Sequence, residues 1–365
     1  MNIGIIDADL LDNGTRHPNL ALMKISAYNK EQGHNVKLLD TYNNIQDYDN
    51  VYLSKVFDFT EIPVDLAQYS NVITGGTGLY WDQSPELLYE VEHHMPDYHL
   101  YDEYIGKEIA RGIKKSHYED YMDYSIGFLT RGCFNKCPFC VNQRYNKVFK
   151  HSPLSEFLDM DKKYIYLWDD NFLGYAKWQD ELDQLEDTGK YFQFKQGLDL
   201  RLVTEEKAKR FSQVKCKGDY IFAFDNIADR EIIEIKLKLW KSYCSKTTKL
   251  YVFCGFDRDN KYDMAFWKQD IIDTFERVKI LMQYGCLSYI MRHVNYEDSP
   301  YRGIYINLAR WCNQPNFYKK KSFREFCEAN GESSSTMRYM REFEKINPEI
   351  AKQYYNLRFE DLNNY

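Results

Sequence analysis

The sequence is poor in the residues that mark flexible linkers and exported proteins. Its 365 residues include only 18 glycines and 9 prolines, so we expect no long flexible linker. The opening residues, MNIGIIDAD, contain neither a basic segment nor a long apolar one, which predicts that there is no signal peptide. No apolar run approaches the roughly 18 residues that a membrane-spanning helix needs. These absences predict a cytoplasmic protein without a membrane partner.

Strong positive charge is also missing. The formal net charge of −7 argues against a protein that coats nucleic acid non-specifically, although it leaves room for a local basic groove. Apolar residues make up 44% of the chain and charged residues 28%, which is typical of a folded globular protein and excludes a disordered or fibrous one. The length exceeds the roughly 100–200 residues of one ordinary domain. We therefore expect two domains, or one barrel with an appended domain.

The first third of the sequence alternates strand-like and helix-like segments. The segment 19–32 has apolar residues at helical spacing, with Pro18 placed for a first turn and Gly33 as a stop. Short β-rich runs occur at residues 3–7, 36–39, 51–56 and 71–74. Four strands with an intervening helix predict a Rossmann-like α/β domain over residues 1–105.

The middle of the sequence carries a regular repeat of strand-like runs. Residues 81–125 lack clear periodicity and are interpreted as connecting chain, with the connector proper at 106–123. Six β-rich runs then follow, whose starts lie 27 to 39 residues apart: SIGFLT (125–130), YIYLW (164–168), YFQFKQ (191–196), YIFAF (220–224), LYVFC (250–254) and LSYIM (287–291). This spacing fits one strand, one helix and two loops, and so a parallel sheet.

Six such units predict a partial (βα)6 TIM-type barrel over residues 124–294. A flat doubly wound sheet is the alternative that spacing alone leaves open. A helical segment is expected over residues 295–365, because N-cap residues precede helical patterns there.

Three of the nine cysteines fall within eight positions, directly after the first strand of the repeat. Cys133, Cys137 and Cys140 have CX3CX2C spacing. Three thiolates on one short loop can wrap a metal centre. A structural zinc site normally takes four ligands, and the nearest histidine, His151, lies eleven residues beyond Cys140. A 4Fe–4S cluster with one open iron needs only three. The spacing alone leaves a cluster, zinc and unliganded thiols open.

This loop resembles the CX3CXφC signature of the radical S-adenosylmethionine superfamily, with Phe139 at the aromatic position. The resemblance covers about residues 124–293, because the motif also follows the first strand of a six-unit βα repeat. It implies that the three cysteines hold three irons, while the fourth iron chelates S-adenosylmethionine. One electron then releases methionine and a 5′-deoxyadenosyl radical that abstracts a substrate hydrogen. It also implies an electron donor such as flavodoxin or ferredoxin.

Polar residues at the carboxyl ends of the other strands are candidates for cofactor contacts, since barrel active sites lie at that face. After the second strand, the resemblance implies contacts with the amino group of the methionine moiety from Asp169, Asp170 and Asn171, although the common Gly-Gly-Glu form is absent. Helix capping is the alternative there. The remaining candidates for cofactor or substrate contacts are Lys195, Gln196, Asp199, Arg201, Asp225 and Arg292. The first four are expected to point into the barrel lumen, with a position at its rim as the alternative. Helix capping is the alternative for Asp225, and a salt bridge for Arg292.

The first domain resembles the cobalamin-binding domain of one branch of this superfamily. A Gly-rich turn, TGGTG at residues 74–78, follows its fourth strand. The DXHXXG loop that supplies a cobalt-ligating histidine is absent, and His17 in the corresponding loop is expected to be a surface residue. Cobalamin is therefore possible but not favoured.

The main hypothesis is thus a radical S-adenosylmethionine enzyme with a 4Fe–4S cluster and an unidentified substrate, whether a small molecule, a peptide or a nucleoside. The first alternative is a cobalamin-dependent methyltransferase of the same superfamily. The second is a zinc- or thiol-based nucleic-acid-binding module, since basic and aromatic residues alternate near 317–324. The six scattered cysteines are expected to be buried thiols, and His93, His94 and His99 to be solvated or interface residues.

Overall fold

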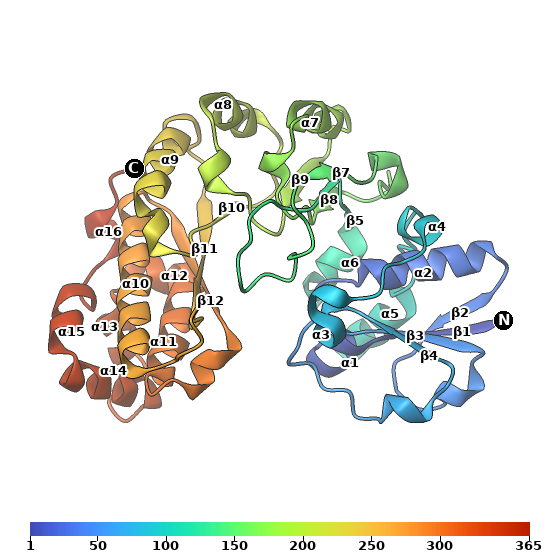
Figure 1. The fold of residues 1–365 in the computed structure, drawn as a ribbon, viewed down its shortest axis with the longest axis horizontal. Coiled ribbons are helices and arrows are strands. Elements are labelled where there is room, and N and C mark those ends of the chain that lie inside the picture. The colour runs from blue at the N-terminus through green and yellow to red at the C-terminus, as the bar shows by residue number, and fades with distance from the viewer. The chain divides into compact units, whose positions relative to one another are not determined.

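The computed structural model describes all residues, 1–365 (Figure 1). The chain divides into two compact units, Met1–Gln193 and Phe194–Tyr365, which are described separately. The division falls within the segment expected to form the barrel, and the domain boundaries expected from the sequence stay predictions. No helix is both long enough and apolar enough to cross a membrane.

The first unit begins with a four-stranded parallel sheet in the order β2-β1-β3-β4. The strands are β1 (Asn2–Asp7), β2 (Asn35–Leu38), β3 (Asn50–Ser54) and β4 (Val72–Gly75). All four strands expected for the Rossmann-like domain are confirmed, with small shifts at their ends. The central strand β1 is buried along almost its whole length, which explains its nearly unbroken apolar sequence.

Helix α2 (Leu20–Glu31) packs against β1 and β2, and it lies above these strands in Figure 1. It begins one residue later than expected, because the Asn19 side chain accepts a hydrogen bond from the Leu22 N–H at 3.2 Å and so caps the helix. Pro18 therefore precedes the cap rather than standing in the first turn. The short helix α1 (Ala8–Asn13) follows β1 directly.

The segment that lacks periodicity folds into short helices. They are α3 (Thr77–Tyr80), α4 (Tyr89–Glu92), α5 (Asp102–Ala110) and α6 (Glu119–Asp123). Buried tyrosines from this region, including Tyr98, Tyr101 and Tyr121, join the core cluster that β1 and α2 form. Tertiary packing of these rings, rather than helical periodicity, fixes the segment.

All six β-rich runs of the repeat are strands. They are β5 (Tyr124–Gly127), β8 (Tyr164–Leu167), β9 (Tyr191–Phe194), β10 (Tyr220–Ala223), β11 (Thr248–Cys254) and β12 (Leu287–Arg292). They form two three-stranded sheets, β5-β8-β9 and β10-β11-β12. Strand β5 pairs with β8, and β11 with both β10 and β12, always in parallel.

Between β5 and β8 the chain forms no α-helix, but α-helices follow β8, β9, β10 and β11 as the repeat requires. They are α7 (Trp178–Asp187), α8 (Glu205–Gln213), α9 (Arg230–Tyr243) and α10 (Met264–Gln283). In the second unit, α10 packs along β11. The alternation of parallel strands and helices confirms the expected α/β class, with a Rossmann-like sheet followed by barrel-type βα units.

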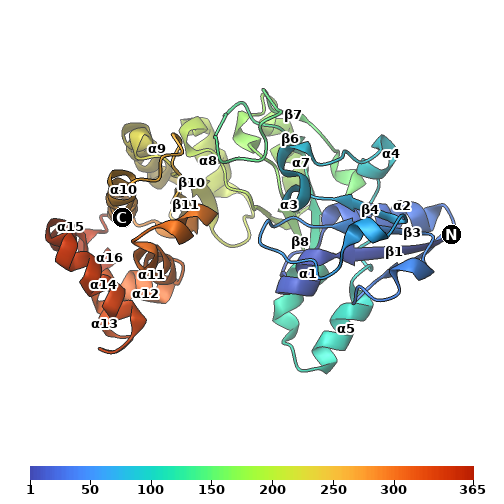
Figure 2. The same cartoon turned by 60° about the horizontal axis from the view of Figure 1, so that its bottom comes forward.

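The chain ends in a helical segment, as expected. Its helices are α11 (Arg302–Cys312), α12 (Pro315–Lys320), α13 (Phe323–Glu328), α14 (Ser335–Ile346), α15 (Pro348–Tyr354) and α16 (Phe359–Leu362), which gather beside the second unit's sheet in Figure 2. The basic and aromatic block lies here. Tyr318 and Phe323 are fully buried, and Arg324 pairs with Glu344 at 2.6 Å. These rings are core residues and cannot stack on a base.

Candidate metal centre

The three clustered cysteines lie on one loop whose two ends are tied together. Strands β6 (Thr130–Arg131) and β7 (Phe149–Lys150) pair in antiparallel fashion and close the loop at its base. The loop leaves the carboxyl end of β5 after only two intervening residues. The parallel sheet thus holds the cysteine loop at the edge where barrel enzymes carry their active sites.

The residue before the first cysteine must be glycine. Gly132 has a φ of +87°, a left-handed conformation, and a Cβ there would lie 2.3 Å from the Lys147 carbonyl oxygen. The two backbone segments at the ends of the loop therefore lie in close contact at the residue before Cys133.

Hydrogen bonds within the loop fix the path between the other two cysteines. The Cys140 N–H donates to the Cys137 carbonyl at 2.9 Å, which forms a tight turn. The Gln143 side-chain amide donates to the same carbonyl at 2.5 Å and to the Cys140 carbonyl at 2.9 Å. Lys136 donates to the Gln143 carbonyl at 2.6 Å. The loop is therefore a folded element with its own hydrogen bonds.

The sulfurs of Cys133 and Cys140 accept hydrogen bonds. Cys133 Sγ accepts from the Asn135 N–H and from the Asn171 side-chain amide, each at 3.3 Å. Cys140 Sγ accepts from the Asn142 N–H at 3.4 Å. Such donors stabilise thiolate charge and tune the potential of a cluster that the sulfurs ligate. This donor set fits an iron–sulfur cluster.

The thiols themselves are half-buried and form no disulfide. Phe139, the aromatic residue of the motif, lies between Cys137 and Cys140 in the sequence and is half-buried. No group of three or more His, Cys, Asp or Glu side chains is gathered closely enough to hold a metal ion. The structure thus places the three cysteines on one loop, and their role as metal ligands stays a prediction.

The side chain of Asp169, after β8, is bonded to the exit of β5. It is buried and accepts hydrogen bonds from the Thr130 N–H and hydroxyl, each at 2.6 Å, and from the Leu129 N–H at 3.3 Å. Burial raises the pKa of Asp169 to about 7, against the opposing effect of these donors. Asp169 holds the base of the loop against the neighbouring strand.

Asp170 spans the cysteine-bearing segment itself. One carboxylate oxygen accepts from the Gly132 N–H at 2.6 Å, and the other accepts from the Asn142 side-chain amide at 2.7 Å. Arg131 lies 3.4 Å away as an ion-pair partner, and the Asp170 side chain is only 8% exposed. A single carboxylate therefore clamps the residues that flank Cys133 and Cys140.

Asn171 contacts a cysteine sulfur directly. Its side chain is buried, its amide nitrogen donates to Cys133 Sγ, and its Oδ1 atom has no hydrogen-bond partner. It makes no capping hydrogen bond to the helix that follows, so the capping alternative is wrong for this residue. The sequence grouped residues 169–171 as cofactor contacts, but it missed that all three side chains contact the cysteine loop.

The candidates after β9 lie in the second unit, where two of them pair with one another. Lys195 and Gln196 were expected within the strand, but β9 ends at Phe194, so they follow it. Asp199 accepts from the Arg201 N–H at 3.1 Å and from its guanidinium at 2.9 Å. Asp199 and Arg201 thus form an ion pair with each other.

Asp225 and Arg292 follow β10 and β12 of the same unit. The Asp225 carboxylate accepts from the Phe253 N–H at 3.2 Å, and burial raises the pKa of Asp225 to about 6, opposed by the charge of Arg277. Arg277 is itself buried and donates to carbonyls at the ends of β10 and β11. Arg292 is exposed, with its guanidinium 4.3 Å from the centre of the Tyr296 ring.

The Gly-rich turn after β4 is shaped mainly by backbone packing. A Cβ on Gly76 would lie 2.1 Å from the Lys55 carbonyl oxygen, and one on Gly78 would lie 2.6 Å from the Phe57 carbonyl oxygen. Only Gly75 faces open space, since a Cβ there would meet no atom within 4 Å. The turn therefore offers one open position to a cofactor.

Exposed apolar side chains also follow the neighbouring strands. Large side chains after β3 and β4 are exposed, at 43% for Val56, 65% for Phe59 and 47% for Trp81. His17 is partly exposed, and its Nδ1 atom pairs with Asp120 on α6. The exposed apolar side chains fit a large, partly apolar cofactor at the carboxyl edge of the sheet.

The other metal-type residues are accounted for by ordinary contacts. Cys216, Cys244, Cys254, Cys286, Cys312 and Cys327 are all buried thiols, as expected. His93 pairs with Glu156 at 2.7 Å, His94 contacts Glu31 at 2.9 Å, and His99 contacts Asp102 at 2.8 Å. These histidines make ion-pair and interface contacts.

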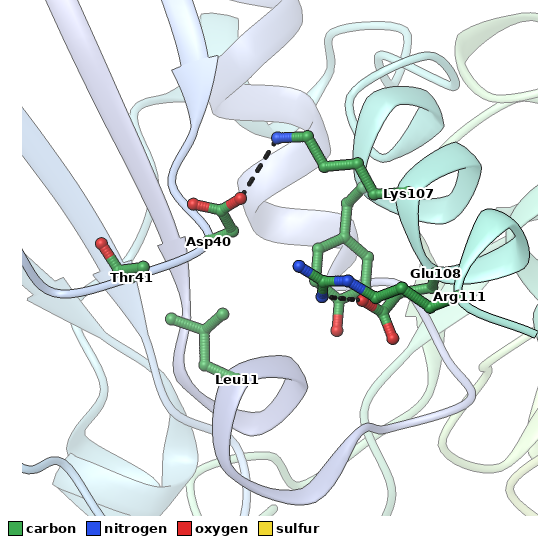
Figure 3. Close-up of a pocket in the computed structure, with 7 residues that line it drawn as sticks. Leu11, Asp40, Thr41, Lys107, Glu108 and Arg111 are labelled. Carbon is green, nitrogen blue, oxygen red and sulfur yellow. Dashed lines mark hydrogen bonds and ion pairs between the residues drawn. The ribbon is translucent and has the colours of Figure 1, made fainter. Parts of the chain in front are cut away.

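A cavity of about 200 Å³ lies between α1, the end of β2 and α5 (Figure 3). Lys107 reaches Asp40 at 3.2 Å, and Arg111 reaches Glu108 at 2.5 Å, as the dashed lines in Figure 3 show. Because its charges are paired with one another, this cavity gives no sign of a charged ligand.

No protein-family model matches the sequence, and no curated protein matches it. Solved structures do. TsrM from Kitasatospora setae, a radical S-adenosylmethionine methyltransferase with cobalamin and a 4Fe–4S cluster bound, superposes with a TM-score of 0.51 at 10% identity, over 80% of this chain and 74% of that one. The same enzyme with tryptophan substrate and a S-adenosylmethionine analogue gives a TM-score of 0.51 at 11% identity, over 79% and 72%.

The cobalamin-dependent radical enzyme OxsB gives a TM-score of only 0.38, at 14% identity over 58% of its length. At identities of 10–11%, the likeness to TsrM concerns the fold. The fold that the cysteine motif and the strand repeat predict is thereby confirmed: over 79–80% of its length, this chain shares the fold of the TsrM structures.

Proposed function

We propose that the chain is a radical S-adenosylmethionine enzyme whose Cys133, Cys137 and Cys140 bind a 4Fe–4S cluster. The observation that carries this proposal is the cysteine loop itself, which leaves the carboxyl end of β5 and is clamped on both sides of its thiols by Asp170. When bound, such a cluster supplies the electron that cleaves S-adenosylmethionine and so starts hydrogen abstraction from a substrate. The protein contributes the position of the ligands and the exclusion of water.

The cofactor contacts remain part of the proposal. We assign S-adenosylmethionine contacts to Phe139 and to the residues after β8, and contacts with cofactor or substrate to the polar residues after β9, β10 and β12. The latter are Lys195, Gln196, Asp199, Arg201, Asp225 and Arg292. An exposed arginine such as Arg292 suits a carboxylate or phosphate.

The substrate and partners follow from the same hypothesis. Tryptophan is the substrate of the similar methyltransferase, which favours a small molecule over a peptide or a nucleoside. An electron donor such as flavodoxin or ferredoxin would reduce the cluster. A cytoplasmic location fits nine cysteines that form no disulfide, because thiols persist in a reducing compartment.

Cobalamin-dependent methyl transfer is the second candidate function. The similar TsrM structure contains cobalamin, so the expectation that cobalamin is not favoured is not supported by the comparison. The open position at Gly75 and the exposed Val56, Phe59 and Trp81 after β3 and β4 fit such a cofactor. Bound cobalamin would supply a methyl carrier, and these side chains would hold it by apolar contact.

The test begins with anaerobic purification, followed by iron and sulfide analysis. The protein is then incubated with S-adenosylmethionine and dithionite, and 5′-deoxyadenosine is measured. We expect about four irons per chain, as a 4Fe–4S cluster requires, and formation of 5′-deoxyadenosine. Cys137→Ala should lose both, whereas Cys216→Ala, a buried thiol outside the loop, should keep both.

The same samples separate the alternatives. Methyl transfer predicts cobalamin in the purified protein and S-adenosylhomocysteine among the products. A colourless protein with stoichiometric zinc, and no 5′-deoxyadenosine after cluster reconstitution, would refute the radical enzyme and favour a zinc-based binding module.

A further inference from the structure

We infer that Asn171 is a positioning residue that sets the reduction potential of the cluster through its hydrogen bond to the sulfur of Cys133. This inference rests on the proposed function, because it concerns a cluster bound at these cysteines. It differs from the role expected from the sequence, which was a contact with S-adenosylmethionine.

The geometry supports a specific bond rather than a chance contact. The Asn171 amide nitrogen lies 3.3 Å from Cys133 Sγ, and the residue is only 2% exposed. A buried side chain loses little entropy when it holds this position, and water does not compete for the sulfur. The Cys133 sulfur accepts from this side chain as well as from the Asn135 N–H.

The neighbouring contacts hold Asn171 in place. Asp169 is bonded to Leu129 and Thr130, and Asp170 is bonded to Gly132, the residue next to Cys133. These hydrogen bonds fix the two chain segments that meet at the Asn171–Cys133 contact. The loop cannot move away from Asn171 without breaking these bonds.

The direction of the effect follows from charge. Reduction adds one negative charge to a cluster and its sulfurs, and a donor aimed at a sulfur stabilises the more negative state. Removing the donor should therefore shift the midpoint potential to a more negative value. We expect the ratio of reduced to oxidised cluster at a fixed potential to fall about threefold, which is roughly 28 mV at 59 mV per tenfold for one electron.

The experiment is a dithionite redox titration of the reconstituted holoprotein, followed by electron paramagnetic resonance of the reduced cluster. Asn171→Leu removes the donor at similar side-chain volume, and Asn171→Ala removes the whole amide. Asn71→Ala is the matched control, because Asn71 is a part-buried asparagine whose amide donates to two backbone carbonyls, those of Ile45 and Tyr48. Both Asn171 variants should shift to a more negative potential, and the control should match the wild type.

A second measurement needs no variant. Wild-type protein carrying ¹⁵N only in asparagine side chains should show a weak nitrogen hyperfine coupling to the reduced cluster, which unlabelled protein lacks. The inference is overturned if this coupling is absent, or if a cluster-containing Asn171 variant keeps the wild-type potential. Should the variants fail to hold a cluster, the labelled wild type decides. If wild-type protein takes up no iron and sulfide, the proposed function fails instead, and the iron analysis shows which of the two is wrong.

Discussion

Replacing Asp170 by alanine should release the cysteine loop on both sides of its thiols at once. The carboxylate accepts from the Gly132 N–H at 2.6 Å and from the Asn142 side chain at 2.7 Å. With a side chain that is 8% exposed, water satisfies neither donor while the loop stays closed. Each hydrogen bond to a charged acceptor contributes about 1.5–3 kcal/mol. Taking the lower value for each hydrogen bond, we expect the free energy of opening the loop to fall by about 3 kcal/mol.

Amide hydrogen exchange followed by mass spectrometry measures this opening directly. Since 1.4 kcal/mol corresponds to a factor of ten, peptides covering residues 130–143 should exchange roughly 100-fold faster in Asp170→Ala. Asp170→Asn keeps one acceptor oxygen but loses the charge, and should exchange roughly tenfold faster. Peptides from the β10-β11-β12 sheet should be unchanged in both variants.

Asp161→Ala is the matched control, because Asp161 is an exposed aspartate eight residues before the start of the 169–171 triplet in the same unit. It should exchange as the wild type does. The clamp would be refuted if the loop in Asp170→Ala exchanged at the rate of this control.

Three further variants probe the loop, the first sheet and the cofactor edge. Gly132→Ala should open the loop and lower iron content, because its Cβ would meet the Lys147 carbonyl at 2.3 Å, whereas Gly106→Ala, with no atom within 4 Å, should leave both unchanged. Burial raises the pKa of Asp7 to about 7, so the stability that its protonated form contributes is complete below its ordinary pKa of 3.8 and is lost as the pH rises to about 7. Urea unfolding should therefore show the wild type losing a few kcal/mol between pH 4 and pH 7, at about 1.4 kcal/mol per pKa unit, with a smaller loss in Asp7→Asn. Gly75→Leu should reduce cobalamin content without lowering the thermal midpoint, because that position is open; unchanged content would remove the cofactor from this edge.

The strands were predictable because parallel sheets that are covered on both faces need continuous apolar runs. Strands β1, β8 and β10 are such runs, and each was located to within a few residues. The helices of residues 81–125 were not predictable from periodicity. Helices of four to nine residues have too few turns to show an apolar stripe, and contacts of tyrosines such as Tyr98 with distant strands hold them in place.

The cysteine motif was readable because its three cysteines are local in sequence. The contacts of residues 169–171 with the loop were not readable, because they join residues 28 to 40 positions apart. The signal that could have found them is the pairing of the first two strands of the repeat. Their parallel register places Gly127 opposite Leu167, so the residues that leave one strand must run beside those that leave the other.

That register also explains why three consecutive polar residues contact the loop at three successive positions. Asp169 bonds to residues 129 and 130, Asp170 to residue 132, and Asn171 to the sulfur of residue 133. The contacts advance in the same order along both chains, as two parallel chains leaving adjacent strands require. A slip of one residue in the pairing of β5 with β8 would shift all three side chains relative to the loop. The sheet register and the position of the cysteine loop are therefore a single structural property, and a substitution that disturbs the pairing should affect iron binding as strongly as one in the loop.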